Sequence, residues 1–135
     1  MPGRILIVDD DPYICDAVEL ILTGAGYTVN AVNSGKSAIE SIRALIPALI
    51  LLDVRMPGIS GLETLTALRR AGVSVPILMM TADNSPATLQ EVMFLGDSGY
   101  VLKPFDADDL IARVGQTLTG ADAPTLPPQT LRRMV

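Results

Sequence analysis

The sequence predicts a single α/β domain built on a doubly wound, five-stranded parallel sheet with helices on both faces. Three observations lead to this fold class. Short apolar runs alternate five times with longer segments whose apolar residues recur at helical spacing. Polar residues do not alternate within the apolar runs, which is typical of strands covered on both faces. The chain has 135 residues, a length suited to one domain with its own core.

The first strand and the helix after it occupy the N-terminal part of the chain. The aliphatic run 4–8 forms the strand. Asp11 is well suited to cap the helix and Pro12 to begin it, and two glycines end it. Cys15, the only cysteine, is expected to be a small buried hydrophobic residue. The residues predicted on the buried face of this helix are Ile14, Val18, Ile21 and Leu22.

A second strand and helix follow, and then a third strand. Residues 27–32 are expected to form the second strand, after which Ser34 can cap a helix. The buried face predicted for that helix contains Ala38, Ile42 and Leu45. The apolar run 48–52 is the third strand, and it stops at Asp53.

The remaining chain continues the same alternation after a loop at 56–61 that contains proline and glycine. The elements predicted there are a helix from about 62 to 72, a strand at 76–80, a helix opening at Ser85-Pro86, a strand at 100–102 and a helix capped by Asp106. Their predicted buried helix faces contain Leu62, Leu65 and Leu68; Leu89, Val92 and Met93; and Leu110, Ile111, Val114 and Leu118.

Chemically distinctive side chains follow the strands at their carboxyl ends, which meet at the ligand-binding edge of such a sheet. They are Asp9, Asp10 and Asp11 after the first strand, Asp53 after the third, Thr81 after the fourth and Lys103 after the fifth. Clustered carboxylates repel a pyrophosphate and attract a hard cation such as Mg²⁺. An ammonium and a hydroxyl beside one carboxylate would stabilise a phosphoryl group on it. The alternative is a set of solvated loop side chains, with Asp11 only a helix cap.

Composition excludes several classes of function. The chain has no histidine, which excludes Ser-His-Asp and Cys-His catalysis, metal sites ligated by histidine, and a phosphohistidine on this chain. A net charge of −5 disfavours binding of nucleic acid or an anionic membrane by residues 1–119. Neither a dinucleotide-binding glycine pattern nor a P-loop is present. The short apolar runs contain no membrane span or signal peptide, so we expect a cytoplasmic protein.

Four motifs carry these residues, and together they resemble the receiver domains of two-component response regulators. The motifs are ILIVDD at 5–10, LLDVRMP at 51–57 with Gly61, MMTA at 79–82 and GYVLKPF at 99–105. The resemblance extends over residues 4 to about 119. It implies a flavodoxin-like (βα)5 three-layer sandwich with strand order 2-1-3-4-5. It also implies a domain that catalyses only its own phosphorylation and dephosphorylation and is not otherwise an enzyme.

The resemblance further implies roles for single residues. Asp53 would accept the phosphoryl group, and Thr81 and Lys103 would contact its oxygens. The residues implied to bind Mg²⁺ are Asp9, Asp10, Asp53 and, through its backbone carbonyl, Arg55. Lys103-Pro104 would be a cis peptide.

The implied partners are a sensor histidine kinase as phosphodonor and a downstream effector domain or protein. Phosphorylation would move Thr81 and turn Tyr100 inward, which would switch the surface formed by the fourth helix, fifth strand and fifth helix. That surface could also support a homodimer. We further hypothesise that Arg55 and Asp83 pair across the mouth of the site and slow hydrolysis; two independently solvated side chains are the alternative.

Two other functions remain to be weighed. A Mg²⁺-dependent phosphatase of the haloacid dehalogenase kind would need a second aspartate two residues after its nucleophile, where this chain has Arg55. A receiver that is never phosphorylated could act purely as an interaction module, but no acid or lysine of the site is missing. We divide the chain into a receiver domain at 1–119 and a Pro-rich linker or tail at 120–135, which either precedes an effector domain or ends a stand-alone receiver.

Overall fold

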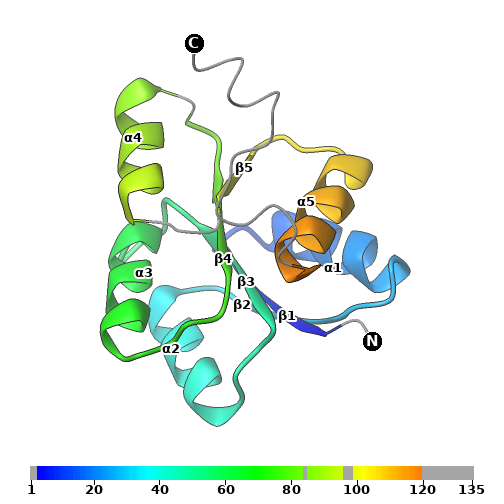
Figure 1. Ribbon diagram of the computed structural model, residues 1–135, viewed down its shortest axis with the longest axis horizontal. Coiled ribbons are helices and arrows are strands. Elements are labelled where there is room, and N and C mark those ends of the chain that lie inside the picture. Colours follow the sequence, from blue (N-terminus) through cyan, green and yellow to red (C-terminus); the bar gives the residue numbers. More distant parts are fainter. Residues whose placement is uncertain (1–2, 84, 96–98, 120–135) are drawn as a thin grey trace.

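The computed structural model describes residues 3–83, 85–95 and 99–119, with side chains in the second range described as far as residue 92. The elements are β1 (Arg4–Val8), α1 (Pro12–Gly24), β2 (Thr28–Val32), α2 (Gly35–Ala44), β3 (Leu49–Asp53), α3 (Gly61–Arg70), β4 (Ile77–Thr81), α4 (Pro86–Leu95), β5 (Tyr100–Leu102) and α5 (Ala107–Thr119). All strand pairs are parallel, and the order is β2-β1-β3-β4-β5. The predicted fold class and strand order are therefore confirmed (Figure 1).

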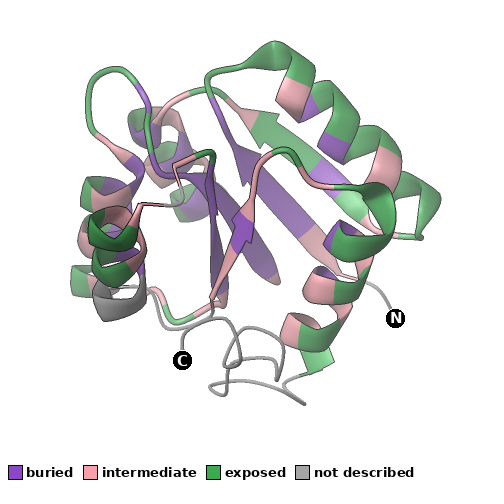
Figure 2. Cartoon of the chain, turned by 90° about the horizontal axis from the view of Figure 1, so that it is seen from above, coloured by how far each residue is buried: buried purple, intermediate pink, exposed green. Residues whose placement is uncertain are grey.

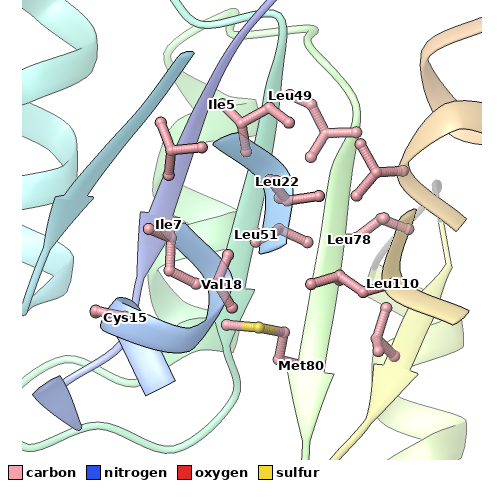
Figure 3. Packing of buried hydrophobic residues seen from close by; sticks show 13 residues of the cluster. Ile5, Ile7, Cys15, Val18, Leu22, Leu49, Leu51, Leu78, Met80 and Leu110 are labelled. Atoms are coloured by element: carbon pink, nitrogen blue, oxygen red, sulfur yellow. The ribbon is translucent and has the colours of Figure 1, made fainter. Parts of the chain in front are cut away.

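The sheet separates two apolar clusters, because successive residues of each strand point to opposite faces. On one face, alternate strand residues pack against α1 and α5, as Ile7 does beside Val18 and Leu78 beside Leu110 (Figure 3). On the other face, the intervening strand residues pack against α2, α3 and α4. The central strands are buried from end to end (Figure 2). This double coverage explains the continuous apolar runs of β1, β3 and β4. The edge strand β2 instead alternates, with Thr28 and Asn30 exposed.

The predicted helix faces are largely confirmed, and Cys15 is buried in the α1 cluster as expected. Leu45 is the exception, since 54% of its surface is exposed. The reason is that α2 ends at Ala44 and Leu45 is an extended C-cap residue, so helical spacing no longer applies to it. The predicted position of Met93 on a buried face lies outside the described side chains.

Element boundaries differ from the predictions by one residue in several places. Tyr27 lies outside β2, and β3 and β4 each begin one residue later than predicted and include Asp53 and Thr81. The third helix begins at Gly61, because Ser60 and Glu63 form a reciprocal capping box. Asp11 and Ser34 cap α1 and α2 as predicted.

The strand order places the candidate site. From β1 the chain passes to β2 on one side, and β3 lies on the other side, so the order reverses at the carboxyl ends of β1 and β3. Val8 pairs with Leu52, which brings Asp9 and Asp53 to the same level of adjacent strands.

Within the described ranges, no helix combines the length and the apolar character needed to cross a bilayer.

Two leucines of α1 give a matched test of this packing. Leu22 is 0% exposed and Leu20 is 77% exposed, although they lie in the same turn of the helix. We expect Leu22→Ala to lower the free energy of unfolding by about 2–5 kcal/mol, because it leaves a cavity in the core. Leu20→Ala should change it by less than about 0.5 kcal/mol. Urea unfolding followed by circular dichroism measures both, and equal losses would contradict this assignment of the core.

Candidate functional site

An open pocket of about 460 Å³ lies at the carboxyl edge of the sheet. Its lining residues are Asp9, Asp10, Asp11, Asp53, Arg55, Thr81, Ala82, Asp83 and Lys103. It therefore brings together all the site residues predicted from the sequence except Tyr100. Tyr100 begins β5 and is half-buried against the apolar cluster on the α2–α4 side of the sheet. Tyr100 is therefore a neighbour of the pocket and not part of its lining.

Asp53 is the innermost carboxylate of the pocket. It ends β3, and only 6% of its surface is exposed. One carboxylate oxygen, Oδ1, lies 3.3 Å from Lys103 Nζ and accepts a hydrogen bond from the backbone N–H of Arg55 at 3.5 Å. Burial, with repulsion from Asp9, raises the pKa of Asp53 to about 6, although Lys103 opposes the rise. The carboxylate is consequently ionised at neutral pH but costs folding energy in that state.

Asp9 and Lys103 form the most deeply buried ion pair of the pocket. Lys103 Nζ donates to Asp9 Oδ2 at 2.7 Å, and the second oxygen of Asp9 accepts the backbone N–H of Asp11 at 2.9 Å. Burial disfavours the charge on Lys103, but its contacts with Asp9 and Asp53 outweigh that effect and raise its pKa. The backbone N–H of Lys103 donates to Thr81 O at 2.8 Å, and Lys103-Pro104 is the cis peptide that the family resemblance implied.

Three of the acidic residues that line the pocket fit a divalent cation. Asp9, Asp10 and Asp53 each offer a carboxylate oxygen, and these oxygens lie within 4.8 Å of one another. Asp9 and Asp53 are buried, while Asp10 is exposed at the open side. Mg²⁺ prefers a few carboxylate ligands and keeps several water molecules, and an open acidic pocket provides for both. The donor set therefore matches the Mg²⁺ site predicted from the sequence.

Thr81 and Asp83 also line the pocket, and hydrogen bonds join them to each other. The Thr81 hydroxyl donates to Asp83 O at 3.1 Å and accepts the Asp83 N–H at 2.9 Å. The Asp83 carboxylate accepts the Ser85 N–H at 2.9 Å and the Thr88 hydroxyl at 2.8 Å, which ties this loop to the first turn of α4. These hydrogen bonds, first of all that from Ser85, hold the pKa of Asp83 well below its usual range.

Arg55 and Asp83 form the predicted pair across the mouth of the pocket. Arg55 Nη2 lies 2.7 Å from Asp83 Oδ2, while the Arg55 side chain remains 72% exposed. The pairing is confirmed, and its effect on hydrolysis stays a prediction. An exposed ion pair of this kind contributes about 0–1 kcal/mol to the free energy of unfolding. Its location at the mouth of the pocket therefore matters more than its effect on stability.

Sequence reasoning named Gly61 only within a motif and did not identify how the residues behind the site support it. Gly61 donates its N–H to Val54 O at 2.9 Å, and a Cβ at this position would collide with the carbonyl oxygen of Asp53. Glycine is therefore required for α3 to start so close to β3. The spacing of Ser60 and Glu63 is a capping-box signature that could have revealed this start. No comparable sequence signal links Thr88 to Asp83.

Comparison with known proteins identifies strong relatives. Residues 5–115 match the response regulator receiver domain family. The DNA-binding response regulator MtrA of Mycolicibacterium smegmatis is 38% identical over 84% of this chain, and the transcriptional regulatory protein ZraR of Escherichia coli is 39% identical over 84%. These alignments cover 50% of MtrA and 26% of ZraR. The chain therefore spans at most about half the length of these curated relatives.

Solved structures agree with the fold. A putative response regulator from Chloroflexus aurantiacus superposes with a TM-score of 0.83 at 35% identity, covering 88% of this chain and 99% of that one. The chemotaxis protein CheY4 of Vibrio cholerae superposes with a TM-score of 0.81 at 31% identity, covering 87% and 99%.

The raised pKa of Asp53 gives a prediction about stability. Its pKa of about 6 in the folded chain lies above its ordinary value of 3.8, so ionisation of Asp53 destabilises the fold, and this loss develops as pH rises through that interval. In metal-free buffer at pH 7.5, Asp53→Asn should raise the free energy of unfolding by about 1–3 kcal/mol. The gain should shrink towards zero as pH falls to 3.8.

Denaturant unfolding at the two pH values measures this effect. Glu40→Gln, at an exposed position of α2, is the control and should change stability by less than about 0.5 kcal/mol at both. A gain for Asp53→Asn that is independent of pH would contradict the electrostatic explanation.

Proposed function

This chain belongs to the response regulator receiver domain family, and from that premise we propose that Asp53 accepts a phosphoryl group and thereby switches an output surface. The observation that carries the proposal is the placement of Asp53. It is a buried carboxylate at the end of β3, with Lys103 within ion-pair distance and two further acidic residues beside it. Since the chain has no histidine, the donor would be the phosphohistidine of a sensor kinase or a small acyl phosphate.

The transfer is a displacement at phosphorus. A carboxylate oxygen of Asp53 forms a bond to phosphorus while the bond from phosphorus to the donor breaks, and the donor's nitrogen or oxygen leaves with the electron pair. Lys103, already 3.3 Å from Asp53 Oδ1, would neutralise part of the charge on the phosphoryl oxygens. Water later attacks phosphorus, which releases inorganic phosphate and restores the Asp53 carboxylate.

The acidic residues would hold the cation that such a transfer needs. Asp9, Asp10, Asp53 and the backbone carbonyl of Arg55 would bind Mg²⁺, which when bound would offset the negative charge of the phosphoryl oxygens. Asp9 also holds Lys103 at 2.7 Å, so it orients the ammonium group towards Asp53. Asp9 is almost completely buried, and the ion pair with Lys103 compensates its charge there.

The switch would begin at Thr81. Its hydroxyl is engaged with the backbone of Asp83, and a phosphoryl oxygen is a stronger, charged acceptor for the same proton. Movement of Thr81 would shift the β4–α4 loop and allow Tyr100 to turn inward. The surface formed by α4, β5 and α5 would change, and β5 and α5 would move together because Arg113 donates to the Tyr100 carbonyl at 2.8 Å.

The changed surface would act on an effector domain or protein, or support a homodimer. MtrA and ZraR are named as a DNA-binding regulator and a transcriptional regulator, and each is much longer than the match. By that analogy, residues 1–119 would be the receiver and residues 120–135 the linker or tail that follows it. The receiver itself would not contact nucleic acid, because its 14 acidic residues exceed its 8 basic ones.

Intact-mass spectrometry after incubation with acetyl phosphate and Mg²⁺ tests the phosphoacceptor. We expect one added phosphoryl group, absent both from Asp53→Asn and from a sample kept in EDTA. An adduct that persists in Asp53→Asn would place the acceptor elsewhere. If no adduct forms with acetyl phosphate or with any sensor kinase tried, the chain would be an interaction module that is never phosphorylated.

The pair between Arg55 and Asp83 gives a prediction about the lifetime of the acyl phosphate. Arg55→Ala keeps the backbone carbonyl but removes the guanidinium from the mouth of the pocket, so water should reach phosphorus more easily. We expect hydrolysis to accelerate about two- to fivefold, the range that an exposed ion pair can supply. Phosphate release after removal of the donor measures the rate. Arg70→Ala, at an exposed position of α3, should leave it unchanged; an equal rate in Arg55→Ala would show that the pair does not slow hydrolysis.

A further inference from the structure

A second cleft lies beside the acidic pocket, between α3 and α4. Its volume is about 480 Å³, within the range of sites that hold a few side chains or a small ligand. The lining residues are Val54, Arg55, Met56, Ser60, Leu62, Glu63, Thr66, Thr88 and Glu91. Neither Asp53 nor the residues predicted to bind Mg²⁺ through carboxylates contribute to it, so the cleft is a separate feature of this face.

The walls of the cleft combine apolar surface with negative charge. Val54 and Met56 are buried and Leu62 is half-buried, and these three residues supply the apolar surface. Glu63 from α3 and Glu91 from α4 are exposed. Such walls suit an apolar side chain with a neighbouring cation and repel an anion.

The carboxylates of Glu63 and Glu91 differ in their hydrogen-bond partners. The Oε1 atom of Glu63 accepts the Ser60 N–H at 2.8 Å within the capping box, which keeps its negative charge at the cleft. Among the described residues, Glu91 makes neither an ion pair nor a side-chain hydrogen bond. A partner's cation could therefore bind Glu91 without displacing an existing contact.

Arg55 is the one cation in the lining, and it belongs to both cavities. It is held at Asp83, whose carboxylate also binds Thr88, another residue of the cleft. A phosphoryl group on Asp53 would place two negative charges near Arg55 and compete with Asp83 for the guanidinium. Asp83 would keep its hydrogen bonds from Ser85 and Thr88, so it would not be left unsatisfied when Arg55 turns away.

We propose that the α3–α4 cleft is a docking site for a basic, apolar segment of a partner protein, and that Arg55 couples its affinity to the state of Asp53. When Arg55 turns towards a phosphoryl group, the cleft loses its only cation and repels a basic segment less. Phosphorylation would therefore strengthen docking, and docking would favour the phosphorylated state to the same extent. The docking part stands on the cleft alone, while the coupling rests on the proposed phosphorylation of Asp53.

Docking is tested on the unmodified full chain with a defined probe. The peptide acetyl-Leu-Lys-Arg-Leu-amide is titrated into the ¹⁵N-labelled chain, with acetyl-Leu-Glu-Glu-Leu-amide as the control peptide. We expect saturable shifts at Leu62, Thr66, Thr88 and Glu91 with the basic peptide only. Glu91→Lys should weaken binding about fivefold or more, whereas Glu40→Lys on α2 should not change it.

Three results would overturn the docking site. They are shifts confined to the acidic pocket, equal binding of both peptides, or equal affinity in Glu91→Lys and Glu40→Lys. The chain's own Leu131-Arg132-Arg133-Met134 has the same chemistry as the probe. If replacing both arginines by glutamate raises the affinity for the peptide, the C-terminal residues themselves occupy the cleft and the assignment to a partner is wrong.

The coupling is tested by repeating the titration with acetyl phosphate and Mg²⁺, using Asp53→Asn in the same buffer as the blank. We expect the phosphorylated chain to bind the basic peptide about threefold more tightly. Arg55→Ala should bind with the tighter affinity whether or not Asp53 carries a phosphoryl group. Unchanged affinity in a chain whose mass shows the adduct would refute the coupling and leave the proposed function intact. A chain that gains an adduct neither from acetyl phosphate nor from any sensor kinase tried would refute both the coupling and the proposed function, but not the docking site.

Discussion

The gathering of like charges at one edge of the sheet is the constraint on which the rest of this structure depends. Asp9 directly follows β1 and Asp53 ends β3, the adjacent strand. Asp10 lies beside both. Because apolar packing on both faces holds those strands, the carboxylates cannot move apart to relieve their repulsion. Lys103 offsets part of it by contacting Asp9 and Asp53 at once. A bound divalent cation would relieve the remaining repulsion between these carboxylates.

The loops around this edge connect it directly to α3 and α4. Gly61 allows α3 to begin directly against the backbone of Asp53, and Asp83 joins the wall of the pocket to the first turn of α4. Two helices are therefore anchored within a few residues of one carboxylate. Under the proposed function, a change of charge at Asp53 would reach both helices through these hydrogen bonds and ion pairs.

Arg55 links the two cavities of this face. In the acidic pocket it stands at the mouth, paired with Asp83, and in the α3–α4 cleft it is the one cation of the lining. Whether paired with Asp83 or turned towards a phosphoryl group, the guanidinium would stay at the mouth of the acidic pocket. One exposed side chain would thus control both the lifetime of a phosphoryl group and the affinity of a docking surface. Small differences in electrostatic energy would decide the position of that side chain.

The sequence by itself determined the fold class and the residues at the strand ends, because continuous apolar runs and strand-terminal polar residues are local signals. The strand order followed only from the family resemblance. It placed Leu45 wrongly, since helical spacing does not reveal that α2 has already ended. Only the tertiary structure decided that Lys103 reaches Asp9 across 94 positions, that Thr88 shares Asp83 with Arg55, and that a cleft opens between α3 and α4. Those features arise where side chains from separate elements meet, and their distances depend on packing that no local pattern encodes.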